Sequence, residues 1–180
     1  MTRMQWVVAL LMVLSVTTAP VWADVECTNQ NTAVPATTPT ADFVLHGDGT
    51  VTHTRTGLMW MRCGLGQSWT GSGCDGSANG YTWRNALNAA QDVNHTGGFA
   101  GHTDWRLPNK NELESIVEER CWSPAINAAV FPNTPNSWYW SSSPIASYSY
   151  DAWLVHFHNG PVGWRDRDNL SHVRLVRAGQ

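Results

Sequence analysis

The side chains best suited to binding or chemistry lie in the last third of the chain, after Trp138. Tyr, Ser, His, Asp, Asn and Arg are dense there and alternate with apolar residues. Binding surfaces favour such side chains because they combine contact area and hydrogen bonding with a low cost of ordering. We therefore expect a ligand-binding surface. The residues assigned to it are Ser147, Tyr148, Ser149, Tyr150, Asp151, His156, His158, Asn159, Trp164, Arg165, Asp166, Arg167, Asp168, Asn169 and His172.

An apolar frame has to position these polar side chains. Within residues 153–158, a period of two sends alternate side chains to opposite faces of the expected strand. The outward set is then Leu154, His156 and His158. The core-facing set, with two later residues, is Trp153, Val155, Phe157, Val173 and Leu175. Because this set holds the fold, the outward positions can change at little cost in stability.

Two patterns in this region would suit a metal ion. His156 and His158 would lie about 6.5 Å apart along one strand face, where a nearby aspartate could complete a transition-metal site. The stretch Asp166–Asn169 is similar to a calcium loop, but it lacks the glycine and the terminal glutamate of that motif. Solvated side chains that face a ligand are the simpler interpretation of both patterns. We therefore expect no metal and no cofactor.

Catalysis is not expected either. Asp104 and Arg106 are candidate catalytic residues, but Arg106 is more simply a partner for a carboxylate or for backbone carbonyls before a helix. Arg174 and Arg177 are likewise interpreted as structural or rim residues. Serine is plentiful, yet no nucleophile-elbow pattern supports a Ser-His-Asp triad. The sequence predicts a binding protein and not an enzyme.

The chain has four cysteines, Cys27, Cys63, Cys74 and Cys121. An even number in an exported chain indicates two disulfides, for which three pairings exist. The preferred pairing closes the glycine-rich loop with Cys63–Cys74 and ties the N-terminal segment down with Cys27–Cys121. A zinc site is the alternative, but no C-x-x-C spacing supports it.

Export is predicted from the N-terminus. Residues 1–23 are typical of a secretory signal peptide, with Arg3 before an apolar run and small residues up to Ala23. The apolar run is too short to anchor the chain in a bilayer, and no transmembrane segment is expected. The destination is the periplasm, the cell surface or the exterior. Cleavage would change the formal net charge from -3 to -4, and Lys110 is the only lysine, so no nucleic-acid partner is expected.

Local patterns divide the chain into three parts. After the signal peptide, residues 24–42 are rich in Thr, Pro and Ala and predict a flexible arm. Residues 43–180 form the expected single domain. It begins with a hairpin over residues 43–53, whose turn is an Asp-Gly pair, and a buried strand over residues 57–61.

Two helices are expected before the strand-rich end. Thr82 caps the first, whose apolar stripe is Trp83, Ala86, Leu87, Ala90 and Val93. Asn109 caps the second, and Glu112 completes a capping-box pattern. Its expected inward stripe is Leu113, Ile116 and Val117, with Cys121 near its end. Two helices followed by short strands and loops indicate an α+β domain.

Five phrases, taken in order, resemble one family of exported bacterial domains. They are Thr56–Trp60, Thr82-Trp83, Asp104–Asn109 before Glu112-Leu113, Tyr139–Ser142 and Val173–Arg177. The family is typified by the C-terminal domain of the Legionella collagen-like adhesin, and the resemblance covers roughly residues 43–180. It implies an adhesin that binds an extracellular protein or glycan. Sulfated glycans as ligands and a trimeric assembly stay open.

A shorter phrase, Arg106-Leu107-Pro108 before an acidic helix, is similar to the formylglycine-generating-enzyme branch of the C-type-lectin fold. That resemblance implies a C-type-lectin-like α+β scaffold with a loop-rich binding face near the C-terminus. The copper-dependent oxidation of that branch is not implied, since it needs C-terminal cysteines and none follows Cys121.

The C-terminal frame also resembles the variable region of target proteins of diversity-generating retroelements. The matching residues are Ala152-Trp153, Val155, Phe157, Gly160, Val162 and the ending Val173–Gln180. In such systems, template adenines are randomised, mostly in Asn codons, which then never encode Lys, Glu, Gln, Met or Trp. None of the first four occurs from Ile145 to His172, and the two tryptophans, Trp153 and Trp164, must be frame residues or come from another codon. The resemblance implies a diversified face that recognises surface molecules of another cell, a host or a phage.

Overall fold

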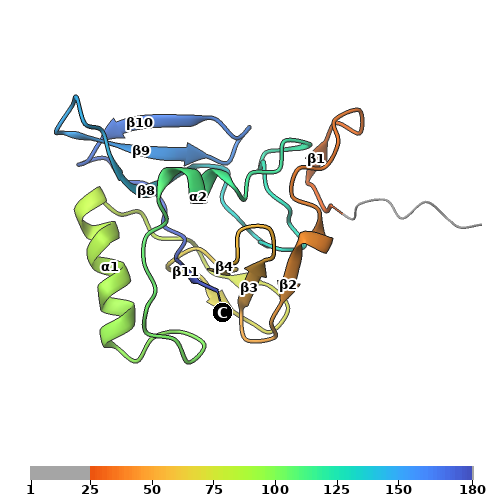
Figure 1. Cartoon of the computed structure of the whole chain (residues 1–180), viewed down its shortest axis with the longest axis horizontal. Helices are drawn as coiled ribbons and strands as arrows, with labels where there is room; N and C mark the ends of the chain where they lie inside the picture. The colour runs from red at the N-terminus through yellow and green to blue at the C-terminus, as the bar shows by residue number, and fades with distance from the viewer. Residues whose placement is uncertain (1–24, 180) are drawn as a thin grey trace, which may run out of the picture.

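The computed structural model describes residues 25–179, so the predicted signal peptide lies outside the described residues. The chain folds into two helices, one 3-10 turn and eleven strands within that range (Figure 1). The helices are α1 (Trp83–His95) and α2 (Lys110–Glu114), and the 3-10 turn is Thr40–Asp42. This mixture of helices and antiparallel strands confirms the predicted α+β class. Neither helix is long and apolar enough to cross a membrane.

The larger sheet has four strands in the order β11-β4-β3-β2, all antiparallel. They are β2 (Phe43–Leu45), β3 (Thr50–His53), β4 (Leu58–Met61) and β11 (Val176–Ala178). The predicted hairpin is β2–β3, and its turn is fixed by Asp48, whose carboxylate accepts the Thr50 N–H at 2.9 Å and the Thr50 hydroxyl at 2.7 Å. The predicted buried strand is β4, which pairs with the C-terminal strand β11.

The second sheet carries the C-terminal third of the chain and has the order β10-β9-β8. Its strands are β8 (Trp138–Pro144), β9 (Asp151–His156) and β10 (Val162–Asp166). The remaining short strands form two separate ladders. They are β1 (Asn29–Gln30) with β7 (Cys121–Trp122), and β5 (Ser68–Trp69) with β6 (Cys74–Asp75). In Figure 1, the second sheet lies above the larger one, and α1 runs along one side of both.

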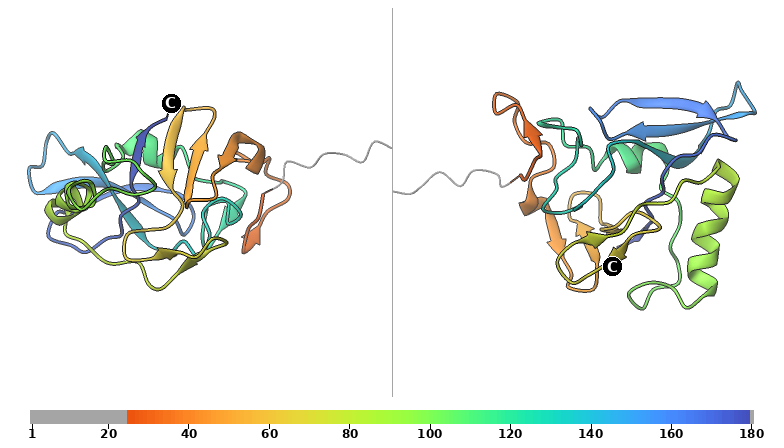
Figure 2. Two further views of the ribbon diagram at one scale, coloured as in Figure 1. Left: turned by 90° about the horizontal axis from the view of Figure 1, so that it is seen from below. Right: turned by 180° about the vertical axis from the view of Figure 1, so that it is seen from behind.

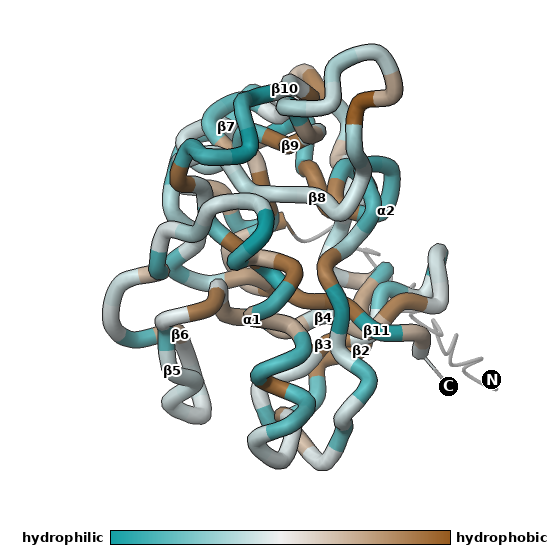
Figure 3. The backbone as a smooth tube through the Cα atoms, turned by 90° about the vertical axis from the view of Figure 1, so that its left-hand side faces the viewer, coloured by the Kyte–Doolittle hydropathy of each residue, from teal (hydrophilic) through white to brown (hydrophobic). Residues whose placement is uncertain are grey.

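Two hydrophobic clusters fill the interior, around β4, β8 and β9 (Figure 3). The first joins the two sheets to the segment around α2 and contains Val51, Trp60, Tyr139, Val155 and Phe157. The second lies under α1 and contains Ala86, Ala90, Trp140, Leu154 and Leu175. The views of Figure 2 show how α1 covers one flank while the N-terminal strands lie at the other end. The strand β9 contributes to both clusters.

The burial of β9 on both faces corrects the expected one-sided strand. Val155 and Phe157 are fully buried as predicted, but so is Leu154, which was expected to face outward. The second cluster covers the Leu154 face, since α1 and Trp140 pack there. Trp153, expected in the core, is only half-buried, and the Lys110 ammonium lies 5.2 Å from its ring.

The sequence predicted where the helices begin more accurately than where they end. Thr82 caps α1 through a hydrogen bond from the Asn85 N–H, and Asn109 with Glu112 forms a complete capping box on α2. However, α2 ends at Glu114. The expected stripe residues Ile116 and Val117 are buried in the turn that follows, and Cys121 lies in β7. Backbone bonds in that turn, such as Val117 N–H to Glu114 C=O at 3.0 Å, replace further helix.

Both preferred disulfides are present, Cys63–Cys74 and Cys27–Cys121. The second one, together with the β1–β7 ladder, holds the segment that the sequence predicts as a flexible arm. Glu118 is fully buried and accepts the backbone N–H groups of Thr37 and Thr38 at 3.0 and 2.6 Å. The structure therefore places residues 25–42 against the domain, because a buried carboxylate has to find donors and this segment supplies them.

The three arginines interpreted from the sequence as structural have structural partners. Arg106 forms a bidentate pair with Glu112, with both distances 2.7 Å, and Arg177 binds Asp104 at 2.7 Å. Arg174 is fully buried and donates to the C=O groups of Met61 and Arg62. The interpretation of these arginines as structural is confirmed by these contacts.

Candidate ligand-binding site

The open end of the β9–β10 hairpin gathers most of the predicted binding residues. The segment before β9 carries Tyr148 and Tyr150, and the segment after β10 carries Asp168. The two are joined by the bond from the Arg167 N–H to the Tyr150 C=O at 2.8 Å. Eleven of the fifteen predicted residues lie here, at the start of β9, along β10 or next to them. They are Ser147, Tyr148, Ser149, Tyr150, Asp151, Trp164, Arg165, Asp166, Arg167, Asp168 and Asn169.

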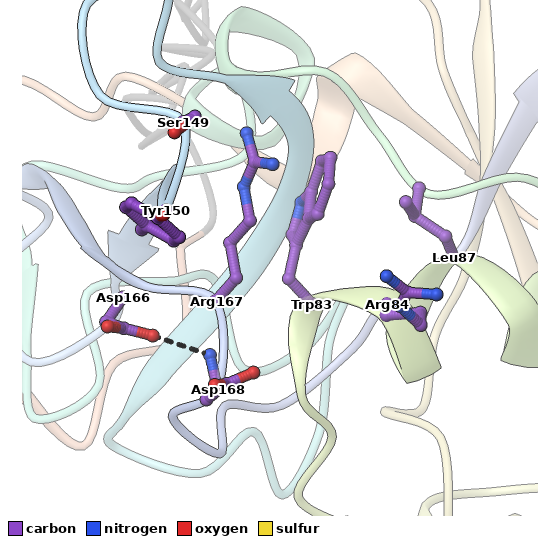
Figure 4. A pocket seen from close by; sticks show the side chains of 8 residues that line it. All are labelled: Trp83, Arg84, Leu87, Ser149, Tyr150, Asp166, Arg167 and Asp168. Carbon is purple, nitrogen blue, oxygen red and sulfur yellow. Dashed lines mark hydrogen bonds between the residues drawn. The ribbon is translucent and has the colours of Figure 1, made fainter.

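A pocket of about 420 Å³ opens between this hairpin end and the first turns of α1. Three separate segments line it (Figure 4). The lining residues are Trp83, Arg84, Leu87, Ser149, Tyr150, Asp166, Arg167 and Asp168. The hairpin end and the helix are held together by the bond from the Trp83 N–H to the Arg167 C=O at 2.8 Å. The pocket is therefore a fixed feature of the fold.

Arg167 forms the centre of the pocket wall. Its guanidinium carbon lies 4.2 Å from the centre of the Trp83 ring, and its Nε donates to the Asp151 C=O at 3.0 Å. Figure 4 shows the two side chains side by side. The indole is fixed in turn, since its Nε1 donates to the Ser141 C=O at 2.8 Å. A guanidinium stacked on an indole in this way is worth about 0.5–2 kcal/mol.

The charges of the pocket are balanced but not paired with one another. Two arginines, Arg84 and Arg167, share it with Asp166 and Asp168. The ion pairs formed by residues 25–179 are Arg55–Asp42, Arg106–Glu112 and Arg177–Asp104, and none of them involves the pocket. Positively charged donors and negatively charged acceptors are therefore available to a ligand.

Exposed aromatic rings border the pocket. Tyr150 is 79% exposed, and Tyr148 and Trp164 are 63% and 60% exposed. The rings of Tyr148 and Trp164 stack with their centres 6.4 Å apart and their planes 12° apart. Large exposed rings that are rimmed by polar groups are typical of binding surfaces. We call the pocket together with Tyr148, Trp164 and Arg165 the recognition face; because Trp164 and Arg165 are neighbours in β10, they lie on opposite sides of the sheet, and this surface wraps around the end of the hairpin.

His156 continues this surface on the Trp138 side of the sheet. Its ring stacks on Trp138 with centres 4.4 Å apart, and the Arg165 guanidinium lies 5.4 Å from the same indole. Burial lowers the pKa of His156, and the nearby charges of His158 and Arg165 lower it further. His156 is therefore a neutral stacking residue at neutral pH.

Three predicted residues lie away from the recognition face. Asn159 lies in the turn at the opposite end of the hairpin, beside Gly160 in another pocket. His172 lies beyond β8, where its Nδ1 is 3.0 Å from the Asn79 C=O. His158 also points elsewhere, with its Nδ1 3.1 Å from the Asn136 Oδ1. Period-2 alternation and sequence proximity do not show which end of a hairpin a residue occupies, so these three were grouped with the others.

The calcium-like stretch is a tight turn built around Asp166. The Asp166 carboxylate accepts the Asp168 N–H at 2.9 Å, and the Asp166 C=O accepts the Asn169 N–H at 3.1 Å. Within residues 25–179, no group of three or more His, Cys, Asp or Glu side chains is placed to hold a metal ion.

Sequence reasoning missed the helical wall of the pocket. Trp83 and Leu87 were assigned to the buried stripe of α1, and Arg84 was not singled out. The structure leaves Trp83 and Leu87 half-buried and Arg84 exposed at the pocket. An aromatic residue in the first helical turn gives no sign of which distant loop packs beside it, so the sequence carried no signal for this wall.

The match to known proteins covers the whole of this site. A family model, the Lcl C-terminal domain, matches residues 49–177. The chain belongs to this family. The resemblance seen in the sequence is thereby confirmed, and membership of the Lcl C-terminal domain family indicates an adhesin-like domain. A search of curated proteins gives no match. The two disulfides of this Lcl C-terminal domain fit an exported protein.

Proposed function

We propose that this Lcl C-terminal domain is an exported ligand-binding protein that recognises a surface molecule of another cell, a host or a phage through its recognition face. The observation that carries the proposal is the pocket between α1 and the hairpin end, with Arg84, Arg167, Asp166 and Asp168 unpaired with one another. Charged groups of both signs that converge on a concave site without forming ion pairs with one another can orient a ligand.

The proposal is for binding without catalysis. Of the described residues that line the pocket, none is a histidine or a cysteine, so Ser149 has no neighbouring imidazole to activate it. The arginines and aspartates there suit orientation of a polar ligand, and the aromatic rings suit contact area.

The recognition face is further proposed to be diversified by a retroelement. Support comes from the exposure of Tyr148 and Tyr150, which can change without disturbing the core. A near-identical repeat of the 3′ coding end, differing only at adenines and lying beside a reverse transcriptase gene, is the expected genomic sign. If no such repeat exists, the domain is an adhesin of fixed specificity.

A fixed glycan-binding adhesin is the second candidate, and the stacked pair of Tyr148 and Trp164 favours it. Flat exposed rings at this spacing can contact the apolar face of a sugar. Binding to a glycan array would support this candidate, and a steep loss of binding with salt would indicate an anionic glycan.

The test of the proposed function compares two variants of the purified protein on a glycan array and on a displayed library of linear peptides. Replacing Tyr148, Tyr150, Trp164 and Arg165 together by Ala should abolish binding of every ligand found, with little change in the melting temperature. The control replaces Val44 and Leu45 of β2, which are exposed on the other sheet, and should bind normally. Equal binding by both variants would refute the proposal.

A further inference from the structure

The outer edge of β10 is left open. The chain covers the outer edge of β8 with residues 171–173, where the Trp140 N–H bonds the His172 C=O at 2.9 Å. It covers β11 with Arg106, which exchanges two backbone bonds with Val176. For β10, no strand or bridge within residues 25–179 lies on the side away from β9, and in Figure 1 it forms the outer margin of the molecule.

The phase of the β9–β10 ladder shows which groups point outward. The His156 N–H bonds the Pro161 C=O at 3.0 Å, and the Arg167 N–H bonds the Tyr150 C=O at 2.8 Å. Antiparallel ladders alternate, so odd-numbered residues of β10 face β9 and even-numbered residues face away. Val162 and Trp164 therefore direct both backbone groups outward, and Asp166 directs its N–H outward. In the described structure no hydrogen bond reaches these five groups.

The outer edge of β2 is also open, but it leaves fewer backbone groups free. On β2, the bonds Thr54 N–H to Asp42 C=O and His46 N–H to Thr50 C=O direct Phe43 and Leu45 outward. The Phe43 N–H is already used by Thr40. The edge of β10 is longer and is continuous through five residue pairs without a bulge. It contains neither a proline nor a bulge, two of the features that usually protect an edge from pairing, and its charged residues are Arg165 and Asp166.

We propose that the edge of β10 binds an extended peptide segment of a protein partner by strand addition. This inference rests on the proposed function and names the class of ligand. Donors and acceptors that recur at every second residue, about 7 Å apart, match another extended backbone. Backbone bonds do not depend on side chains, so they hold a partner in place while the side chains around them set the specificity.

Side chains along β10 define the chemistry of the partner strand. Arg165 lies on the Trp138 side of the sheet and has no ion pair, while Trp164 points to the other side beside Tyr148. The partner segment therefore carries an acidic residue next to Arg165 and an apolar residue next to Trp164. A second copy of this chain fits less well. If two β10 strands paired about Trp164, each Arg165 would face Gly163 of the other copy and stay unpaired.

The test uses a synthetic pool of linear seven-residue peptides in which Val or Thr alternates with Asp, Glu, Leu or Tyr. Trp164→Pro removes the outward N–H together with the indole, and Trp164→Ala removes the indole alone. Because the Trp164 N–H makes no bond in the fold, the proline leaves the β9 ladder intact. Peptide affinity, measured by fluorescence anisotropy, should be about five-fold or more weaker for Trp164→Pro than for Trp164→Ala.

A second measurement acts on the peptide and does not depend on how the variants fold. Methylating the backbone N–H of every second peptide residue should abolish binding in one phase, in which the methylated groups face β10, and leave it unchanged in the other phase, which is shifted by one residue. If no peptide of the pool binds, if both methylation phases bind equally, or if the two Trp164 variants bind equally, strand addition is refuted. The proposed function is judged separately, since glycan or protein ligands lost on replacing Tyr148, Tyr150, Trp164 and Arg165 would still support it. A protein that only self-associates through β10 would also refute the inference.

Discussion

Glu118 should be the single residue that most strongly holds the N-terminal segment to the domain. Its side chain is fully buried, and its carboxylate accepts the backbone N–H groups of Thr37, Thr38 and Arg120 at 3.0, 2.6 and 3.0 Å. The Thr38 hydroxyl donates a fourth bond at 2.9 Å. We predict that Glu118→Gln, a change of nearly the same shape, destabilises the protein.

The magnitude follows from the donors that glutamine cannot satisfy. Its amide has one oxygen, and its NH2 group would face backbone N–H donors, so at least two of the four bonds are lost. Bonds to a charged acceptor are worth about 1.5–3 kcal/mol each. The free energy of unfolding should therefore fall by about 3–6 kcal/mol in urea denaturation. The Thr37 and Thr38 amides should also exchange hydrogen faster, while Cys27–Cys121 keeps the segment attached.

The adjacent residue supplies a matched control. Glu119 is exposed and its side chain makes no hydrogen bond among residues 25–179, so Glu119→Gln should change the stability by no more than about 0.5 kcal/mol. If the two variants unfold at the same urea concentration, the carboxylate of Glu118 does not hold the segment, and residues 25–42 behave as the loose arm that their composition suggests.

Two further predictions concern the core and the pH dependence of stability. Leu154→Ala should lower the free energy of unfolding by about 2–5 kcal/mol because its side chain is fully buried under α1. The control Tyr150→Ala should lower it by less than about 0.5 kcal/mol. Similar losses for both variants would contradict the two-sided burial of β9. Burial lowers the pKa of both His53 and His156, so the unfolded chain binds more protons than the native one once the pH falls below about 6.5. Stability should therefore decrease from pH 7 to pH 5, by at most about 1.4 kcal/mol per pH unit for each histidine. Urea unfolding at both pH values should show a smaller decrease for His53→Gln, and an equal decrease would mean that His53 does not contribute to the pH dependence.

Local signals in the sequence predicted the parts of the fold that depend on neighbouring residues. The Asp48 turn, the Thr82 cap and the Asn109 capping box were all predicted, because each depends on hydrogen bonds within a few residues. The end of α2 was wrong because the apolar spacing continues through Val117 while the backbone turns. The burial of Leu154 was missed because it depends on α1, which lies far away in the sequence.

The candidate site was predicted in the same partial way. The hairpin strands could be located, and residues close in sequence, such as Tyr148 and Tyr150, do lie together. What the sequence could not supply was the direction of the hairpin and its neighbour in space. Asn159 was therefore grouped with residues at the opposite end, and Trp83 was assigned to the core although it lines the pocket.

The positions of the recognition face differ in how freely they can change. Tyr148, Tyr150 and Trp164 are largely exposed and their side chains make no hydrogen bonds in the described structure, so substitution there should leave the fold intact. Arg167 is different, because it stacks on Trp83 and also bonds the backbone of the hairpin. Diversification that changes Tyr148 and Tyr150 would alter specificity alone, whereas a change at Arg167 would also alter the shape of the pocket that the other residues share.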